Sequence, residues 1–307
     1  MNFKHLSFPV AAFALALASS SPLRADILTN GLVAFYPFNG NFNDESGNGN
    51  HGTPNNVGFA VDRFGRTNRA VSFAGNSSSF VKVTSTNLDL PPDFTVSVWI
   101  NYTAGAGTEG PRIISTSGYE ITTDSVFVTN RHINFDNTLA SGSGFTSVSS
   151  SNGIVAGVWS HVVAVRVGNE LRLYINGNLA GSVSTSQPPD YSRGFVPEIG
   201  GNSGNDSDNY AGLIDDLRIY NRALPANEVA QLYVVESVPR VDLVKAVKPV
   251  FFYLTVGTNY QLQISGDFNT WTNQGAVFTA TNSNMIYPQY WDVDNWNSLY
   301  FRLQSVP

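Results

Sequence analysis

The sequence predicts an all-β protein, because strand-like alternation and turn dipeptides recur along most of its length. In the segment FTVSVWI, residues 94–100, every second residue from Phe94 to Ile100 is apolar. A period of two is typical of a strand with one buried face. Helical periodicity is nearly absent and Gly, Asn and Ser turns are frequent, so two packed antiparallel sheets fit better than an alternating α/β scheme.

A meander of three strands is predicted between residues 159 and 183. The odd positions of residues 159–167 share a face, Gly168-Asn169 interrupts them, and alternation resumes over residues 171–175. Asn176-Gly177 follows at once, and this dipeptide best tolerates the positive φ angles of a type I′ turn. Residues 179–183 can then return as the third strand.

One helix is predicted after the last strand of this region. Pro225 marks its start, because proline at the first helical position loses no hydrogen bond that the helix would otherwise make. Val229, Leu232 and Tyr233 follow at spacings of three and four, which gives a one-sided apolar stripe. We expect this helix to pack on the last strand.

The first 25 residues are typical of a secretory signal peptide. Lys4 and His5 precede an apolar stretch over residues 8–18, and small residues follow it. We expect cleavage after Ala25, with Ala18 as the alternative. The stretch is too short to span a bilayer. These features predict an exported protein without membrane insertion, placed outside the cell, on its surface or in the periplasm.

The remaining chain is predicted to form two domains. Residues 26–235 carry the pattern described above, and residues 236–248 show no sustained alternation, as expected of a connector. Alternation returns in residues 249–307, in the segments 251–256, 260–265, 276–281 and 299–304. The fold class that we predict is therefore an all-β sandwich followed by a small C-terminal β-sandwich domain.

Composition limits the classes of partner and the sources of stability. The chain has 307 residues, of which 42% are hydrophobic and 13% charged, and its net charge is -6. This charge does not favour nucleic acid or anionic lipid as a partner. The chain has no cysteine, so no disulfide can constrain the unfolded state of this exported protein. Its stability must come from packed cores, from bound metal, or from both.

Five segments, in this order and spacing, resemble the LamG-like domains of secreted bacterial proteins, the laminin-G-like branch of the concanavalin A-type jelly rolls. They are GLVAFYPFNGNFNDESGNGNHG (31–52), AVSFAG (70–75), FTVSVWI (94–100), GVWSHVVAVRVGNELRLYINGNLAGS (157–182) and GLIDDLRIYNRALPANEVAQLY (212–233). The resemblance implies a jelly-roll sandwich but leaves the ligand open, since many functions share this fold. The string YQLQISGDFNTW near the C-terminus resembles add-on modules of exported environmental bacterial proteins, and it implies no function.

The sequence does not predict a catalytic site. Glycoside cleavage on a concanavalin-type fold normally uses carboxylates paired on one strand, where alternation places them on one face. The nearest candidates, Glu120 and Asp124, lack a third acid. His51, His132 and His161 do not have a zinc-type spacing. We therefore predict a protein that is not an enzyme.

Two acidic segments predict a calcium site. Asp44 lies in a glycine-broken loop that can aim carbonyl oxygens inward, and Asp215-Asp216 lies in the predicted final strand. Ca²⁺ prefers such oxygen ligands. In related jelly rolls a calcium ion often joins the first loop to the last strand, and the resemblance assigns that role to Asp44 with Asp215 or Asp216. The alternative is a polar turn and an ion pair from Asp216 to Arg218 or Arg222.

Aromatic residues near predicted loops are candidates for stacking on sugar rings. The predicted ligand-binding residues are Tyr119, Tyr191, Phe195 and Tyr210. The alternative is that these rings belong to the core.

Three functions fit these observations. We favour an exported recognition or adhesion protein that binds a glycan or an extracellular protein through its LamG-like domain. The alternatives are a divergent polysaccharide-cleaving enzyme and a structural envelope protein with no small ligand. The missing acid pair argues against the enzyme.

Overall fold

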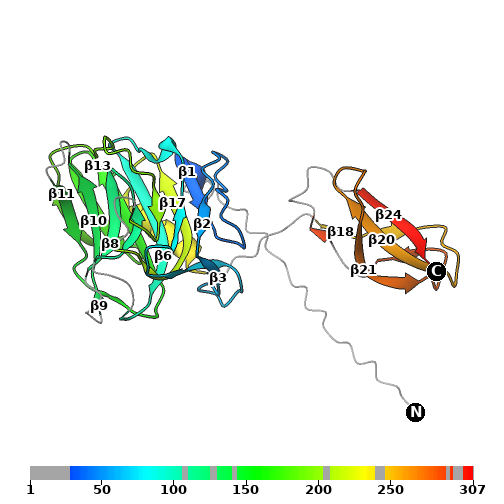
Figure 1. Cartoon of the computed structure of the whole chain (residues 1–307). Helices are drawn as coiled ribbons and strands as arrows, with labels where there is room; N and C mark the ends of the chain where they lie inside the picture. Colours follow the sequence, from blue (N-terminus) through cyan, green and yellow to red (C-terminus); the bar gives the residue numbers. More distant parts are fainter. Residues whose placement is uncertain are drawn as a thin grey trace, which may run out of the picture. The chain divides into compact units, whose positions relative to one another are not determined.

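The computed structural model describes residues 28–105, 110–124, 130–139, 144–202, 208–238, 246–287, 291–292 and 300–306. The predicted signal peptide lies outside the described residues. The chain divides into two compact units, Met1–Pro239 and Arg240–Pro307 (Figure 1). This division falls within the region predicted to be the connector. Among the described residues, no helix has the length and apolar character needed to cross a membrane.

The first layer of the N-terminal unit is an eight-stranded antiparallel sheet in the order β15-β14-β13-β6-β17-β4-β3, with β1 paired to β17. Its strands are β1 (Leu32–Tyr36), β3 (Gly58–Ala60), β4 (Ala70–Ala74), β6 (Phe94–Tyr102), β13 (Ser160–Val167), β14 (Glu170–Ile175), β15 (Asn178–Ser184) and β17 (Ala211–Tyr220). The predicted meander is confirmed as β13, β14 and β15. Asn176 and Gly177 have φ angles of 50° and 77°, as a type I′ turn requires.

The second layer is a seven-stranded antiparallel sheet in the order β11-β10-β8-β7-β16-β5-β2. Its strands are β2 (Thr53–Asn55), β5 (Phe80–Lys82), β7 (Arg112–Ser115), β8 (Tyr119–Thr123), β10 (Ile133–Thr138), β11 (Phe145–Ser149) and β16 (Glu198–Ile199). Two short strands, β9 (Asn130–Arg131) and β12 (Ile154–Val155), pair separately, and a 3₁₀ turn covers Thr86–Leu88.

The main core lies between these two sheets. Phe94, Val96 and Val98 of β6 belong to it, together with Ile121 of β8 and Phe135 of β10. The alternation in FTVSVWI therefore identified the inward face of β6 correctly. The all-β jelly-roll prediction is confirmed.

Helix α2 (Ala226–Glu236) covers part of the opposite face of the eight-stranded sheet. Pro225 is its N-cap residue, so the helix begins one position after the start that the sequence predicts. Val229 and Leu232 pack there with Tyr220 of β17, so the predicted contact with the last strand is confirmed. Because of this cover, Thr95 and Ser97 on the outward face of β6 are also buried, and the strand is not half-buried as predicted.

The C-terminal unit contains a three-stranded antiparallel sheet in the order β21-β20-β24 and two short strand pairs. Its strands are β18 (Ala246–Val247), β19 (Val250–Phe251), β20 (Asn259–Ser265), β21 (Thr272–Thr279), β22 (Met285–Ile286), β23 (Trp291–Asp292) and β24 (Tyr300–Val306). Phe251, Leu254 and Leu262 belong to its core. The prediction of a strand over residues 251–256 is wrong beyond Phe251, because Tyr253 has a left-handed φ of 61° that interrupts the extended backbone.

Candidate functional site

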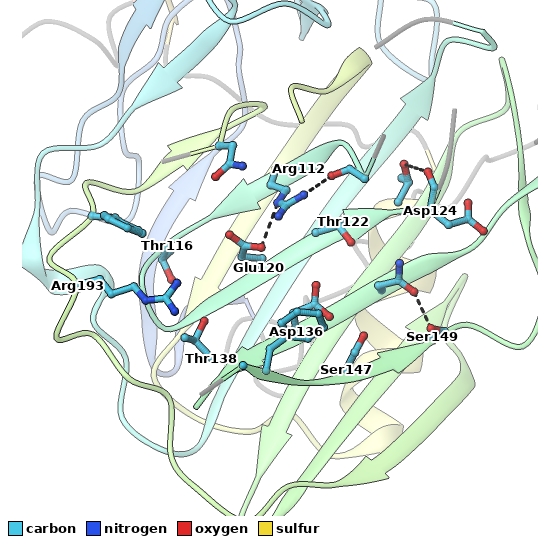
Figure 2. Close-up of a pocket in the computed structure, with 17 residues that line it drawn as sticks. Arg112, Thr116, Glu120, Thr122, Asp124, Asp136, Thr138, Ser147, Ser149 and Arg193 are labelled. Carbon is cyan, nitrogen blue, oxygen red and sulfur yellow. Dashed lines mark hydrogen bonds and ion pairs between the residues drawn. The ribbon is translucent and has the colours of Figure 1, made fainter. Parts of the chain in front are cut away.

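A polar cleft of about 720 Å³ lies on the face of the seven-stranded sheet that is turned away from the core (Figure 2). Alternation on β8 explains its lining. Tyr119 and Ile121 point into the core, so Glu120 and Thr122 point into the cleft. The lining residues are Gly110, Arg112, Thr116, Glu120, Thr122, Thr123, Asp124, Asn134, Asp136, Thr138, Gly144, Phe145, Ser147, Ser149, Arg193, Phe195 and Asn202.

Cross-strand register arranges the floor of the cleft in two rows over β7, β8, β10 and β11. Each row takes one residue from each strand, and neighbours in a row are paired positions of adjacent strands. The first row is Glu120, Asp136 and Ser147, with the buried Ser115 paired to Glu120 at its end, and the second is Arg112, Thr122, Asn134 and Ser149. Paired positions bring Cβ atoms to about 4.5–5.5 Å from each other, so each row is a continuous line of polar groups.

The carboxylate of Glu120 is held by its neighbours. Its Oε2 accepts a hydrogen bond from Arg112 Nε at 3.0 Å, and its Oε1 accepts one from the Ser115 hydroxyl at 2.9 Å. Arg112 also pairs with Asp208, with 3.2 Å between Nη1 and Oδ2. These contacts fix both oxygens of Glu120 within the cleft floor.

Asp136 differs from Glu120. Its Oδ1 is buried and has no hydrogen-bond partner among the described residues. Burial, with a smaller contribution from the Glu120 charge, raises the pKa of this carboxyl to about 6, although a hydrogen bond with Ser147 lowers it. Asp136 is therefore an acceptor whose bonding capacity the protein leaves partly unused, in a cleft wide enough for a ligand.

Two aromatic rings lie among the polar groups of the cleft lining. Phe145, at the start of β11, leaves 65% of its surface exposed. Phe195 is half-buried, and the Arg193 guanidinium lies 6.0 Å from its ring centre. Sequence reasoning predicted Phe195 but missed Phe145, Asp136 and Asn134. The available signal was the alternation in FTSVS, which puts Phe145 on the same face as two serines.

Three of the predicted ligand-stacking residues do not line the cleft. Tyr119 and Tyr210 have no exposed surface, so the prediction that they contact ligand is wrong. The Tyr119 ring centre lies 4.8 Å from that of Phe94 in the core. Tyr191 is half-buried and packs edge-on against Tyr119 at 6.5 Å. The Tyr191 ring packs directly on Gly118, because a Cβ atom added at Gly118 would lie only 2.4 Å from Cε1 of the ring.

The three predicted calcium ligands have partners within the chain. Asp44 accepts backbone N–H groups of Phe35 and Ser46 at Oδ1 and of Asn50 at Oδ2, each at 2.9 Å. Burial raises the pKa of Asp44, but these hydrogen bonds lower it by more, so its pKa lies below the usual value. The carboxylate thus braces the loop after β1.

Arg63 occupies the cation position beside the other two predicted ligands. Its Nη1 lies 2.5 Å from Asp215 Oδ2, and its Nη2 lies 2.7 Å from Asp216 Oδ2. The sequence suggested Arg218 or Arg222 as the ion-pair partner of Asp216, but in the structure Arg63 takes that place. Arg218 instead bonds Glu236, with 2.6 Å between Nε and Oε1.

No group of three or more His, Cys, Asp or Glu side chains suited to a metal ion occurs in the described parts of the chain. Calcium binding stays a prediction. Its expected result is a lower melting temperature in EDTA than in Ca²⁺, because a ligand bound only to the folded state adds about 2.7 kcal/mol of stability at a hundredfold excess over Kd. Identical melting curves in the two conditions would contradict it.

Comparison with known proteins agrees with the fold. Residues 74–230 match the Laminin_G_3 family model, described as the concanavalin A-like lectin/glucanases superfamily. The chain belongs to this family. No curated protein matches this Laminin_G_3 chain.

Solved structures with the same fold include receptor-binding parts of bacterial toxins. The binding domain of Paraclostridial Mosquitocidal Protein 1 is 19% identical, with a TM-score of 0.55, and the match covers 76% of this chain and 58% of that one. The botulinum neurotoxin serotype G binding domain is 16% identical, with a TM-score of 0.54 and coverages of 75% and 56%. A third similar structure concerns botulinum neurotoxin type C, whose cell entry is described as dependent upon interaction with two ganglioside molecules. It is 15% identical, with a TM-score of 0.51 and coverages of 78% and 58%. This Laminin_G_3 chain thus spans less than two thirds of each of these structures.

Proposed function

We propose that this protein binds a carbohydrate chain in the cleft of its seven-stranded sheet, without cleaving it. The observation that carries the proposal is the buried Oδ1 of Asp136, which lacks a hydrogen-bond donor among the described residues. A sugar hydroxyl supplies such a donor, and a hydrogen bond to an ionised acceptor is worth about 1.5–3 kcal/mol.

The rest of the lining suits the same ligand. Asn134, Thr122 and Ser149 add acceptors and donors in the second row, where several hydroxyls of one sugar unit can bond at once. Exposed Phe145 offers a flat apolar face on which a sugar ring can stack. Two rows that cross four strands favour a chain of several units over a single sugar. The dependence of botulinum neurotoxin type C on two ganglioside molecules for cell entry supports carbohydrate as the ligand class on this fold.

We further propose that the protein acts outside the cytoplasm. Support comes from the sequence of residues 1–25, which has the order of charged, apolar and small residues found in signal peptides. An extracellular glycan or glycoprotein is then the available partner. Weak single-site binding is sufficient there, because many copies on a surface add avidity.

Hydrolysis is the second candidate function, and one observation favours it. Glu120 and Asp136 occupy paired positions on β8 and β10, and their environments differ, as acid–base pairs require. The sequence suggested Asp124 as the partner of Glu120, whereas Asp136 is the acid that lies opposite Glu120. Against catalysis, Arg112 and Ser115 hold both oxygens of Glu120, so only Asp136 of this pair has a carboxylate oxygen without a hydrogen bond among the described residues.

We expect Phe145→Ala to reduce retention on immobilised xylan, β-glucan or galactan about fivefold without changing the melting temperature, because the exposed ring contributes little to packing. Leu179→Ala, at a 58% exposed position on β15 of the other sheet, is the matched control and should be retained as the unchanged protein is. Equal retention of both variants would contradict the proposed site. Release of reducing ends that disappears in Glu120→Gln would establish the enzyme instead.

A further inference from the structure

The C-terminal unit carries a surface cluster of aromatic side chains outside its core. Phe268 is 63% exposed and Tyr300 is 37% exposed. The Phe268 ring centre lies 4.5 Å from that of Tyr300 and 5.6 Å from that of Trp271, both in edge contacts. The Arg302 guanidinium lies 4.2 Å from the Trp271 ring centre. Core packing does not use these groups, so their exposure needs another explanation.

Strand alternation places this cluster on the face of the sheet opposite the core. Phe301 and Leu303 of β24 pack on the core, so Tyr300 and Arg302 point the other way. On the same face, Arg302 Nε donates to Gln263 Oε1 at 2.8 Å, and Gln263 Nε2 donates to Asn273 Oδ1 at 2.7 Å. A row of planar polar groups therefore crosses all three strands beside the rings.

The loop that presents Phe268 is strained and firmly held. Phe268 has a φ of 66°, a left-handed conformation that is unfavourable for a bulky side chain. Asp267 holds this turn, because its Oδ1 accepts the backbone N–H groups of Asn269 and Thr270, each at 2.8 Å. These hydrogen bonds lower the pKa of Asp267 to about 2, so it stays ionised and keeps the turn in place. Strain that is kept in order to expose an apolar ring points to a binding role.

Arg302 sets the charge of the ligand. Among the described residues it forms no ion pair, and only its Nε is used in a hydrogen bond within the chain. The remaining donors of the guanidinium form a planar pair, which matches a carboxylate. The described residues thus combine stacking rings, amide groups and one unpaired cation on a single sheet face.

We propose that this face is a second binding site, and that it takes an acidic polysaccharide: a sugar ring stacks on Phe268 and Tyr300, and the carboxylate of a uronic acid unit pairs with Arg302. This site goes beyond the proposed cleft, because it lies in the other unit and selects for charge. A protein with both sites would bind two kinds of glycan, or two parts of one mixed chain.

The experiment uses the full chain carrying Phe145→Ala, so that the cleft ring does not contribute. Electrophoresis through gels containing polygalacturonate, with dextran as the neutral comparison, gives an affinity from the retardation. Phe268→Ala should weaken binding to polygalacturonate at least about fivefold. Tyr253→Ala is the matched control, because Tyr253 is also aromatic, 96% exposed and left-handed, with a φ of 61°. It should leave binding unchanged.

Arg302 provides the test of charge. Arg302→Gln should abolish the preference for polygalacturonate over dextran, and about 0.5 M NaCl should weaken binding of the parent chain but not that of this variant. If Phe268→Ala lowers the melting temperature, Phe268→Leu, which keeps apolar volume but not the flat ring, replaces it and should show the same loss. The proposal is overturned if polygalacturonate does not retard the parent chain, or if it retards the Phe268 and Tyr253 variants equally. A Phe268 variant that melts at a lower temperature but binds as before also overturns it.

Discussion

Replacing Arg63 with alanine is expected to lower the free energy of unfolding of the N-terminal unit by about 3–5 kcal/mol, because it removes one partner of a buried ionic network. Arg63 extends from the loop between β3 and β4 and bonds Asp215 and Asp216 of β17. It also donates from Nε and Nη2 to the backbone oxygen of Glu236, at 3.1 and 2.9 Å, near the C-terminal end of α2. One guanidinium thus joins three separate parts of the unit.

The charge balance of this network explains the size of the effect. Arg63 and Arg218 face three carboxylates, those of Asp215, Asp216 and Glu236. Without Arg63, only Arg218 would remain beside three buried acids. Burying unpaired charge destabilises the folded state. Burial and the Asp216 charge already raise the pKa of Asp215 to about 9. Asp215 is therefore largely protonated at pH 7, and the charge of Arg63 is balanced chiefly by Asp216.

Urea unfolding of Arg63→Ala at pH 7 checks this expectation. Arg66→Ala is the matched control from the same loop. The Arg66 side chain is 50% exposed and pairs with the buried Asp62 alone, so its loss should cost less than the loss of Arg63. Adding Asp216→Asn to Arg63→Ala should restore part of the stability, because fewer charges are then left unpaired. Similar losses for Arg63→Ala and Arg66→Ala would show that the network is energetically unimportant.

The sequence predicted the parts of the fold that depend on local pattern. Alternation identified β6 and the β13–β15 meander, and the Asn176-Gly177 turn fixed the return of β15, because side-chain period and turn geometry act within a few residues. The pairing of Arg63 with Asp215 joins positions 152 residues apart, and no local pattern reveals it. The sequence suggested calcium, Arg218 or Arg222 as partners of these aspartates, and the ion pairs in the structure are with Arg63.

The candidate site could not be fully predicted either, because it also depends on pairing between distant residues. Glu120 and Asp136 face each other because β8 and β10 pair in one particular register, across residues that carry no turn signal. Reasoning from the sequence compared Glu120 only with the nearby Asp124. The error over Tyr119 has a different cause, because the period of β8 puts Tyr119 on the face of Ile121, and that pattern was available. A residue near a loop was taken to be exposed, although its strand position buried it.

Asp136→Asn is expected to stabilise the protein at pH 7 while weakening glycan binding. The folded state raises the pKa of Asp136 from 3.8 to about 6, so it binds this proton more tightly than the unfolded state does. As pH rises from about 4 to about 6, the unfolded state loses the proton first, and stability therefore falls. Above pH 6 the carboxyl is ionised in both states, and its burial then lowers the free energy of unfolding by about 3 kcal/mol, at about 1.36 kcal/mol for each pKa unit. A neutral amide avoids most of this loss.

The gain in stability should depend on pH, and so should the loss of binding. Asp136→Asn should raise the free energy of unfolding by about 1–3 kcal/mol at pH 7 and by little at pH 4, where the carboxyl of the unchanged protein is already neutral in the folded state. Its affinity for the polysaccharide identified by retention should fall about tenfold at pH 7, because an amide oxygen is a weaker acceptor than a carboxylate. The affinity of the unchanged protein should rise as pH passes through about 6, whereas that of the variant should not.

Glu120→Gln is the matched control for this prediction, since it makes the same chemical change at the paired position. It should destabilise the protein, because Arg112 loses the charge that Glu120 supplies at 3.0 Å. Opposite signs for two neighbouring carboxylates would show that Glu120 maintains the floor of the cleft while Asp136 is held there, at a cost to stability, for a ligand. A stabilised Asp136→Asn that still binds glycan with full affinity would show that the cleft is not the site.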